Sequence, residues 1–431
     1  MTALTRADRV RGRLIFLILL VGILAAVYGR DRAQAGSAYQ DMASKGIETM
    51  QSWYDWSRGR WATTGWWNSA NALTVLVNYS SVSGSTAYQA AIENSFDRNA
   101  SGGFLNDYYD DEGWWALAWT DAYDLTGDTR YLDMARFIFD DMTTGWDDVC
   151  GGGIWWKKPA IYKNAIANEL FLSVAAHLAN RVNDPDEQAR DFAWAEDEWH
   201  WFRQSGMINA DNLINDGLNS GCQNNGRTTW TYNQGVILGG LAELAQDDPD
   251  PDLPDTAQAI ALAAIDRLTE NGVLHDRCEP NCGADGVQFK GIFVRNLAAL
   301  NSVFPDTRYV GFTTVNASSI WNADQGPDYQ FGQVWSSWLD DPVGDAARQS
   351  CALDALVSAA QMTDSIAEMS GSMSYSLPPV VASRHAFTSR SWSARSLGGR
   401  HAIWLRGARP GVGPGFSWPR ETREDRPTFE R

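Results

Sequence analysis

A turn followed by a helix start recurs along this chain, and it constrains the fold more than any other feature. Three copies match closely: Ser83-Gly84-Ser85-Thr86-Ala87-Tyr88, Thr126-Gly127-Asp128-Thr129-Arg130-Tyr131 and Phe304-Pro305-Asp306-Thr307-Arg308-Tyr309. Similar turn chemistry recurs at Asn183-Asp184-Pro185-Asp186 and Asp248-Pro249-Asp250-Pro251. Gly and Pro end one helix, whereas Asp, Ser or Thr caps the next. Such self-similarity predicts a repeat of helix pairs.

Two classes of helix alternate between these turns. One class is apolar nearly all round, as expected for helices buried on both sides. We predict its members at about Trp66 to Tyr79, Glu112 to Leu125, Ala165 to Asn180, Thr231 to Gln246, Gly291 to Val303 and Gln349 to Met362. Their more charged partners are predicted at about Ala38 to Trp56, Thr86 to Phe96, Thr129 to Met142, Glu187 to Phe202, Asp255 to Glu270 and Thr307 to Trp321.

This alternation predicts an all-α (α/α)6 barrel of six inner and six outer helices. An open helical solenoid is the alternative architecture. Long irregular segments separate outer from inner helices, and such segments fit one end of a closed toroid better than an open array.

The two ends of the chain differ from its middle. Four arginines precede the apolar run Leu14 to Val27, and Ala33-Gln34-Ala35 offers a small-residue cleavage site, so residues 1–35 are predicted to be a signal peptide. A signal anchor is the alternative, but the apolar run is short for a membrane span. Residues 36–368 are predicted to form the barrel domain. Residues 369–431 are rich in Ser, Arg, Gly and Pro and predict a disordered tail.

The middle of the chain is strongly acidic, because residues 36–368 contain 47 Asp and Glu against 19 Lys and Arg. Such a surface repels phosphate backbones, so we expect no nucleic-acid partner, whereas a neutral glycan is tolerated. Simple solubility is the other explanation of this charge. We expect a secreted or cell-wall-associated monomer without stable membrane insertion after signal cleavage.

Five cysteines in a chain predicted to be exported indicate one or two disulfides with one thiol left over. Cys278 and Cys282 flank a turn, so pairing between them or with Cys222 is expected. Cys351 lies in an apolar helical pattern and is the candidate free thiol.

Metal and cofactor chemistry is not indicated. The five histidines have no recognisable ligand spacing, so we expect no zinc site and no other cofactor. Three N-glycosylation sequons agree with export but also arise by chance. They lie at Asn78, Asn99 and Asn316.

Tryptophans crowd the irregular segments, in the company of Asn and of Gly151-Gly152-Gly153. The ones in or beside these segments are Trp53, Trp56, Trp61, Trp66, Trp67, Trp114, Trp115, Trp155, Trp156 and Trp230. Aromatic faces beside polar amides suit a sugar, which presents apolar C–H faces and a fringe of hydroxyls. Core packing is the better explanation for any single Trp, but with 21 in the chain we do not expect all to be core.

A cluster of carboxylates opens the second apolar helix, in the run Asp107-Tyr108-Tyr109-Asp110-Asp111-Glu112-Gly113-Trp114-Trp115. Asp110 or Asp111 could simply cap the helix and complement its dipole. Alternatively, the two carboxyls divide the work of glycoside cleavage, one attacking the anomeric carbon and the other protonating the leaving oxygen. Adjacent residues can hold carboxyls about 5 to 5.5 Å apart, the separation expected for retention of configuration.

A magnesium site for a diphosphate is a weaker interpretation of this cluster. Some helical barrels use the pattern D-D-x-x-D, but Trp114 occupies its last position here. No second acidic motif and no cluster of Arg or Lys accompanies it, so the sequence does not favour this site.

Several blocks together strongly resemble glycoside hydrolase family 76. They are Asp110-Asp111-Glu112-Gly113-Trp114-Trp115-Ala116-Leu117-Ala118, Asp124-Leu125-Thr126-Gly127-Asp128, Tyr131-Leu132, Cys150-Gly151-Gly152-Gly153-Ile154-Trp155-Trp156, Tyr162-Lys163-Asn164-Ala165-Ile166-Ala167-Asn168-Glu169-Leu170, Thr229-Trp230-Thr231-Tyr232-Asn233-Gln234-Gly235 and Phe289-Lys290-Gly291-Ile292-Phe293. The blocks span roughly residues 40 to 362. Each alone is weak, but the combination is specific.

The resemblance implies an (α/α)6 fold and retaining endo-action on α-1,6-mannan, with Asp110 as nucleophile and Asp111 as acid/base. The family also includes fungal cell-wall proteins thought to act as transglycosylases on the mannose of GPI anchors, which is the alternative activity. A noncatalytic mannan-binding protein is a third possibility. From their place in the family blocks beside helix starts, the residues expected in the glycan groove are Trp115, Trp155, Asn164, Asn168, Trp230, Tyr232 and Asn233.

Overall fold

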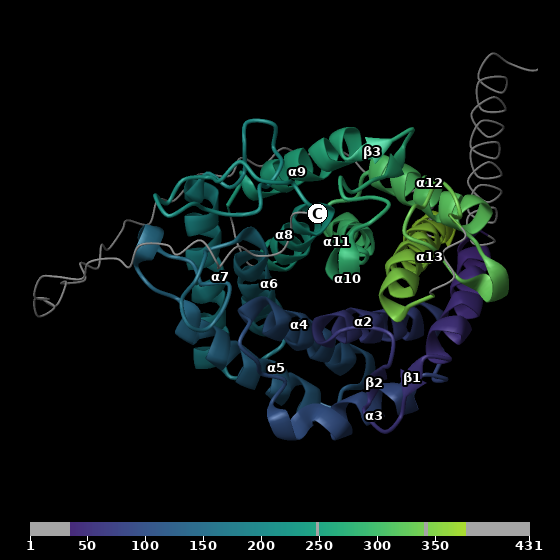
Figure 1. Ribbon diagram of the computed structural model, residues 1–431, viewed down its shortest axis with the longest axis horizontal. Helices are drawn as coiled ribbons and strands as arrows, with labels where there is room; N and C mark the ends of the chain where they lie inside the picture. Colours follow the sequence, from purple (N-terminus) through teal and green to yellow (C-terminus); the bar gives the residue numbers. More distant parts are fainter. Residues whose placement is uncertain (1–34, 247–249, 340–343, 376–431) are drawn as a thin grey trace, which may run out of the picture. The chain divides into compact units, whose positions relative to one another are not determined.

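The computed structural model describes residues 35–246, 250–339 and 344–375. This part of the chain is mostly helical, with only short two-residue strands (Figure 1). None of the described helices combines the length and apolarity needed to cross a membrane. The predicted signal segment, apart from residue 35, and the predicted tail from residue 376 onward lie outside the described residues and stay predictions.

Six helices form a closed inner ring in the described ranges. They are α2 (Trp66–Ser83), α4 (Tyr109–Thr126), α6 (Ala165–Ala179), α8 (Thr231–Leu244), α11 (Phe289–Val303) and α13 (Ala346–Tyr375). Each packs against the next one in this order, and α13 packs back against α2 (Figure 1). An open solenoid has no such last contact, so the predicted barrel is confirmed.

An outer helix precedes each inner helix. After a first helix over residues 35–51, these are α3 (Gln89–Asn99), α5 (Thr129–Met142), α7 (Pro185–Ser205), α9 (Leu253–Arg267) and α12 (Thr307–Ala323). The inner helices are buried nearly all round; for example, Ala165 to Ala176 of α6 are all buried. The two helix classes therefore alternate because inner helices are buried on two sides, whereas outer helices are buried on one.

The predicted helix ends were wrong at a few places. The first outer helix stops at residue 51 rather than at Trp56, which lies in the turn between β1 (Tyr54–Asp55) and β2 (Arg60–Trp61). A second hairpin, β3 (Thr269–Glu270) with β4 (Val273–Leu274), follows α9. At the other end, α13 continues to Tyr375, past the predicted domain end at residue 368.

The repeated turn works as predicted in two of its three close copies. The carboxylates of Asp128 and Asp306 accept hydrogen bonds from Arg130 N and Arg308 N and so cap α5 and α12. Asp184 caps α7 in the same way. In the remaining copy, α3 starts only at Gln89 and has no side-chain cap. The capping carboxylates satisfy backbone N–H groups that have no partner inside the helix.

A polar network joins the six inner helices to one another. Arg295 of α11 donates to Asp354 of α13 at 3.0 Å and to Asn71 of α2 at 2.6 Å. Just past the end of α6, Arg181 donates to Glu243 of α8 at 2.9 Å. The positive charges of Arg295 and Arg181 attract the carboxylate of Asp121 on α4 and oppose the rise in its pKa that burial causes. A buried charge is tolerated only when paired, so this network favours one relative placement of the inner helices.

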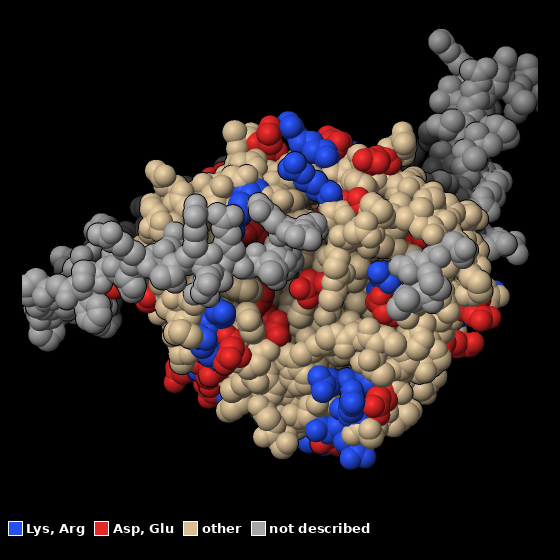
Figure 2. Space-filling model, in the orientation of Figure 1, with Lys and Arg blue, Asp and Glu red and all other residues tan. Residues whose placement is uncertain are grey.

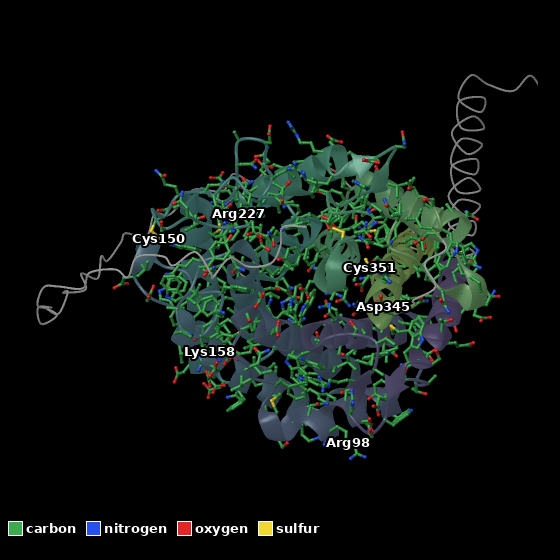
Figure 3. The ribbon with its side chains drawn as sticks, viewed as in Figure 1. Arg98, Cys150, Lys158, Arg227, Asp345 and Cys351 are labelled. Carbon is green, nitrogen blue, oxygen red and sulfur yellow. A yellow bond between two sulfur atoms is a disulfide. The ribbon has the colours of Figure 1, made fainter. Side chains whose placement is uncertain are left out.

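The cysteines form two disulfides in the described residues. Cys278 pairs with Cys282, as expected, whereas Cys222 pairs with Cys150 rather than with either of them. The pair Cys150–Cys222 joins two irregular segments 72 residues apart. Cys351 is the free thiol, buried on α13 (Figure 3).

One predicted sequon is excluded by the fold. Asn316 is fully buried on α12, where its amide accepts from Leu274 N at 2.8 Å and donates to Phe312 O at 2.9 Å. A side chain held in this way is out of reach of glycosylation. Asn78 and Asn99 are half-buried, and their glycosylation stays a prediction.

Two buried carboxyls lie between the inner and outer layers. Glu169 of α6 and Glu198 of α7 are fully buried, and no oxygen of either has a hydrogen-bond partner in the described part of the chain. Burial raises the pKa of Glu169 well above its ordinary value, and the charges of Asp216 and Glu198 raise it further. The folded protein therefore holds Glu169 protonated at pH values where the unfolded chain has released the proton.

Stability should for this reason fall as the pH rises above the ordinary glutamic acid pKa toward the raised pKa of Glu169. We expect Glu169→Gln to reduce this loss above the ordinary glutamic acid pKa, because glutamine carries no proton to release. Thermal unfolding followed by circular dichroism across this range tests the expectation. Glu93→Gln, on the exposed side of α3, is the matched control and should follow the native curve. Parallel curves for Glu169→Gln and the native protein would contradict the prediction.

Candidate active site

Asp110, Asp111 and Glu112 form the first turn of the inner helix α4. The N-cap position is held by Tyr108, and no side chain caps the helix. Neither aspartate is therefore the cap that the simpler sequence interpretation required. The helix N-terminus still favours negative charge at this turn.

Each aspartate has one specific hydrogen-bond donor. The indole Nε1 of Trp156 donates to Asp110 Oδ2 at 3.0 Å, and Asn106 Nδ2 donates to Asp111 Oδ2 at 2.6 Å. The second oxygen of Asp110, Oδ1, is buried without a partner in the described residues. An unpartnered oxygen beside a hydrogen-bonded one is what a carboxyl needs if it is to react.

An irregular segment lays Trp156 against α4. Tyr109 N donates to Trp156 O at 3.0 Å, and Lys158 N donates to Asp107 O at 2.8 Å. On the other edge, Trp156 N donates to Tyr162 O at 2.8 Å. The segment is thus paired like a strand on both sides, which fixes the position of the indole over Asp110.

Burial and mutual repulsion shift the titration of the pair. Desolvation, followed by the charge of Asp111, raises the pKa of Asp110 well above its ordinary value. Desolvation also raises the pKa of Asp111 to about 6, and the charge of Asp285 adds to the rise, whereas the Asn106 hydrogen bond lowers it. The pair therefore retains a proton under conditions in which an exposed aspartate is fully ionised.

A third carboxyl, that of Asp216, acts on Tyr232 together with Asp110. Tyr162 donates its hydroxyl to Asp216 Oδ2 at 2.6 Å and accepts from Asn225 Nδ2 at 2.7 Å. Tyr162 has a φ of 62°, which is unusual for a bulky residue and marks a strained position. A side chain at Gly217 would collide with this hydroxyl, since an added Cβ would lie 2.6 Å from it.

Asp285, on the short helix α10 (Gly283–Gly286), approaches from another part of the ring. Its carboxylate accepts from Trp67 Nε1 at 2.9 Å, and its charge acts on Asp111. Acidic side chains are seen near the middle of the face shown in Figure 2. An acidic group from a second element thus adds to the negative charge around the pair.

The residues predicted for the glycan groove divide into two groups, and the first group is structural. Trp115 is fully buried and packs on Phe104 and Trp119, at ring-centre distances of 4.9 and 5.6 Å. Asn168 is fully buried, and its amide bonds both backbone groups of Ile154. Predicting groove contacts for these two was wrong, because other parts of the chain already cover their polar and apolar surfaces.

Two further predicted groove residues also lie below the surface. Asn164 caps α6 by accepting from Ala167 N and is 6% exposed. Asn233 is fully buried, and neither atom of its amide has a partner in the described residues. The structure places neither amide at an open surface.

The second group consists of half-buried aromatics. Tyr232 stacks on Phe289 with ring centres 3.8 Å apart, and Trp230 meets the same ring edge-on at 5.6 Å. Burial raises the pKa of the Tyr232 hydroxyl well above its ordinary value, and the charges of Asp216 and Asp110 raise it further. Trp230 and Tyr232 therefore remain candidates for contact with a ligand.

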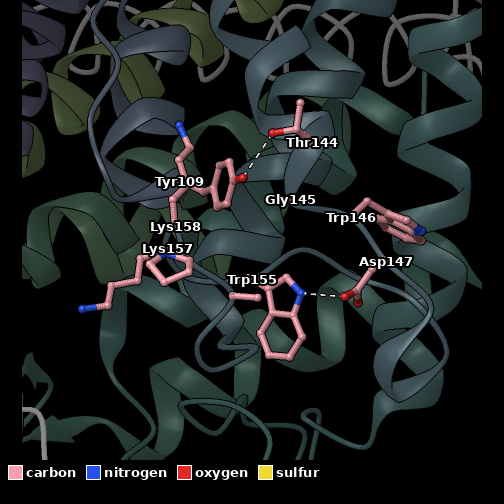
Figure 4. Close-up of a pocket in the computed structure, with 10 residues that line it drawn as sticks. Tyr109, Thr144, Gly145, Trp146, Asp147, Trp155, Lys157 and Lys158 are labelled. Atoms are coloured by element: carbon pink, nitrogen blue, oxygen red, sulfur yellow. Dashed lines mark hydrogen bonds between the residues drawn. The ribbon is translucent and has the colours of Figure 1, made fainter. Parts of the chain in front are cut away.

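Trp155 faces away from the aspartates. Adjacent residues of an extended segment point in opposite directions, and Trp155 lines a separate pocket of about 220 Å³ (Figure 4). Its Nε1 donates to Asp147 at 2.9 Å, and Asp147 also accepts from Lys163 at 2.7 Å. These polar groups are hydrogen-bonded to one another. The pocket therefore lies on the face of the segment opposite to the face from which Trp156 contacts Asp110.

Three residues that act on the pair were not predicted as site residues. They are Asn106, Trp156 and Asp285. Trp156 lies inside the family blocks, so the resemblance could have pointed to it. Asn106 and Asp285 lie outside these blocks, and only the folded chain brings them to the pair.

Comparison with known proteins supports the assignment suggested by this geometry. The model of glycosyl hydrolase family 76 matches residues 35–370, which include five of the six inner helices and α13 up to residue 370. The chain belongs to glycosyl hydrolase family 76. This membership confirms the resemblance inferred from the sequence blocks.

Curated relatives of this family 76 chain are fungal. The mannan endo-1,6-α-mannosidase DCW1 of Saccharomyces cerevisiae is 27% identical over 325 residues, covering 68% of this chain and 71% of that protein. The protein of the same name in Candida glabrata is 26% identical over 284 residues, covering 59% of this chain and 62% of that protein. Across the curated relatives, the matched region spans 50% to 71% of their length.

Solved structures share the family 76 fold. An α-1,6-mannanase from Salegentibacter sp. superposes with a TM-score of 0.66 at 24% identity, covering 75% of this chain and 99% of that chain. Dfg5 from Chaetomium thermophilum, in complex with glucosamine, gives a TM-score of 0.66 at 20% identity, with coverage of 76% and 91%.

The burial of Trp115 yields a test that separates a core tryptophan from a surface one. Trp115→Ala should lower the free energy of unfolding by about 3 to 5 kcal/mol, since it empties a packed aromatic site. Trp155→Ala, at a half-buried position, is the matched control and should cost clearly less. Urea unfolding of the two variants measures the difference. Equal losses would contradict a core role for Trp115.

Proposed function

We propose that this family 76 protein is a retaining, endo-acting glycoside hydrolase that cleaves α-1,6-mannosidic linkages in mannan. Asp110 and Asp111 are its catalytic carboxyls. The observation that carries the proposal is their placement: two adjacent, desolvated carboxyls on one helical turn, neither of them a helix cap, each with its own donor.

The reaction follows from two carboxyls on the same turn. One carboxylate attacks the anomeric carbon, while the other carboxyl gives its proton to the departing glycosidic oxygen. A covalent glycosyl ester forms and the C–O bond to the leaving sugar breaks. The second residue, now ionised, then removes a proton from water, and this water displaces the ester and restores the starting configuration.

Two indications about the roles within the pair disagree. The family resemblance assigns the nucleophile to Asp110 and the acid/base to Asp111. Desolvation raises the pKa of Asp110 well above its ordinary value and that of Asp111 to about 6, which places the shared proton of the free protein on Asp110. We retain the assignment from the family, because binding of a sugar changes the solvation of both carboxyls.

The substrate class is supported by the relatives. Those of fungi are named mannan endo-1,6-α-mannosidases. The Salegentibacter mannanase was also solved as an inactive variant with two consecutive aspartates replaced by asparagine, in complex with α-1,6-mannotriose. A consecutive aspartate pair is also what this chain presents. Trp230 and Tyr232 are proposed to contact the C–H faces of mannose units.

Export belongs to the same proposal. The segment 1–35 has the composition of a signal peptide, and the two disulfides fit an oxidising compartment. We propose action outside the cell or at the cell wall. Transfer to a sugar acceptor instead of water uses the same covalent intermediate, so transglycosylation is the alternative outcome of the same chemistry.

One experiment tests activity, mechanism and roles together. Linear α-1,6-mannan, and separately α-1,6-mannooligosaccharides with an acceptor sugar, are followed by NMR for product size and anomeric configuration. The native protein should release short oligosaccharides that are initially α. Asp110→Asn should abolish turnover. Asp111→Asn should lose about 10²- to 10⁴-fold on mannan but much less on substrates with activated leaving groups, which need no proton.

Asp107→Asn is the matched control, because Asp107 is exposed and lies three residues before the pair. It should keep native activity. Initial release of β product would refute the mechanism. Full activity in both Asn variants would return the pair to a structural role, and preserved turnover in Asp110→Asn alone would reverse the two roles. Mannan binding without turnover would favour a noncatalytic protein, and predominant transfer to the acceptor would favour the transglycosylase.

The raised pKa values predict the pH profile. A general acid must be protonated at the start of the reaction, and the pKa of Asp111 is raised to about 6. We therefore expect kcat/KM on mannan to fall as the pH rises above about 6, since Asp111 then loses the proton that it must give to the leaving oxygen. With an activated leaving group, Asp111→Asn should lack this basic limb. The same limb in both proteins would show that another group supplies the proton.

A further inference from the structure

A buried ion pair lies directly beside the catalytic turn. Glu112, which follows Asp111 on α4, is fully buried, and its Oε1 accepts from Lys158 Nζ at 2.6 Å. The same ammonium forms an ion pair with Asp141 of the outer helix α5 and lies 4.7 Å from the ring centre of Tyr109. Lys158 is marked in Figure 3.

Both partners of this pair hold the backbone of Asn106. Glu112 Oε1 accepts from Asn106 N at 3.0 Å, and Lys158 Nζ donates to Asn106 O at 3.2 Å. The side chain of Asn106 in turn donates to Asp111. The ion pair therefore acts on the residue whose amide contacts the proposed acid/base.

The same lysine also anchors the donor to the other aspartate. Lys158 lies two residues after Trp156, whose indole donates to Asp110, and Lys158 N is bonded to Asp107 O. With its side chain held by Glu112 and Asp141, the short strand-like segment cannot move away from α4 without breaking a buried ion pair. The contact between Glu112 and Lys158 thus helps to hold the hydrogen-bond donors of both proposed catalytic carboxyls in place.

Stability alone does not explain this arrangement. A buried ion pair gives little net stability compared with apolar residues of the same shape, because desolvation offsets the attraction. The ion pair instead fixes the geometry of the groups bonded to it, since charge-assisted hydrogen bonds hold their partners at a defined distance and angle.

We infer that Glu112 and Lys158 are positioning residues, whose ion pair holds Asn106 and Trp156 in hydrogen-bonding contact with Asp111 and Asp110. The inference rests on the proposed function for its catalytic meaning. Neither residue is assigned a contact with substrate. Their effect passes through the two donors, and its size is set by how far the donors move when the pair is lost.

Glu112→Leu gives the sharpest test, because it removes the oxygen that accepts from both Lys158 and Asn106. Burial raises the pKa of Glu112 to about 8 although Lys158 opposes the rise, so below this pH the substitution removes hydrogen bonds rather than a full negative charge. Releasing Asn106 and the Trp156 segment removes donors that stabilise the ionised carboxylates, which should raise the pKa values of the two aspartates. Asp285, whose charge acts on Asp111, and Tyr232, on whose hydroxyl the charge of Asp110 acts, lie on other elements and are unchanged by this substitution.

We expect Glu112→Leu to lower kcat on α-1,6-mannan by about 10- to 100-fold with KM little changed. The pH at which kcat/KM falls on the acidic side, where the nucleophile takes up a proton, should move to a higher value. Glu112→Gln keeps an acceptor oxygen for Lys158 and Asn106 and should stay within about threefold of native activity. Lys158→Met should reproduce the loss of kcat by opening the same pair, which keeps the test available if Glu112→Leu fails to fold.

Arg136→Met is the matched control. It opens an ion pair with Glu187 that joins two outer helices, so its kinetics and pH profile should be native. Native kcat and an unshifted or lowered limb in a folded Glu112→Leu, together with native kinetics in Lys158→Met, would overturn the inference.

Carbon-13 NMR of aspartate-labelled full-length protein supplies a readout that does not depend on turnover. Asp110→Asn and Asp111→Asn assign the two carboxyl signals, and Glu112→Leu should raise at least one of their pKa values. If the native protein does not cleave mannan, the proposed function fails, and this titration still decides the positioning role. If the native protein cleaves mannan and the titration is unmoved, the positioning role fails alone.

Discussion

Closure of the ring of inner helices is the constraint on which the rest of this structure depends. Each inner helix is covered by neighbours on both sides, so its sequence must be apolar almost all round. Because an outer helix returns the chain between consecutive inner helices, the inner helices run in the same direction and their N-termini gather at one end. The irregular segments that enter these helices meet at that end, and the aspartate pair lies in the first turn of one of the helices. The few charges placed between the inner helices, such as Arg295 with Asp354, are paired between neighbouring helices.

The chemistry of the site rests on a balance between burial and hydrogen bonding. Burial raises the pKa of both aspartates, while the donors Trp156 and Asn106 oppose the rise. A carboxyl pair poised in this way can hold one proton and still offer one anion, which is the state that glycoside cleavage with retention requires. Both donors come from irregular segments, whereas the carboxyls lie on helix α4. The irregular segments therefore influence the reactivity of the carboxyls.

The many tryptophans serve two purposes that their positions in the sequence do not separate. Trp115 and Trp119 fill the space between layers, where they stack on each other. Trp155 and Trp156 are neighbours on an extended segment, yet one meets Asp147 and the other meets Asp110. Backbone hydrogen bonds along both edges of the segment determine which of its faces turns toward the pair. The number of aromatic residues in the sequence does not predict this orientation.

The sequence by itself determined the helical repeat and the order of inner and outer helices, and it singled out the aspartate pair that we propose as catalytic. Periodicity and capping act over a few residues, so they can be recognised locally, as at Asp128 and Asp306. Only the tertiary structure decided which side chains surround the pair. Asp285 comes from a segment more than 100 residues beyond the pair, and no local pattern marks it. Burial likewise decided that Trp115 and Asn168 are structural, because a side chain beside a helix start is exposed or covered according to what the remainder of the ring places over it.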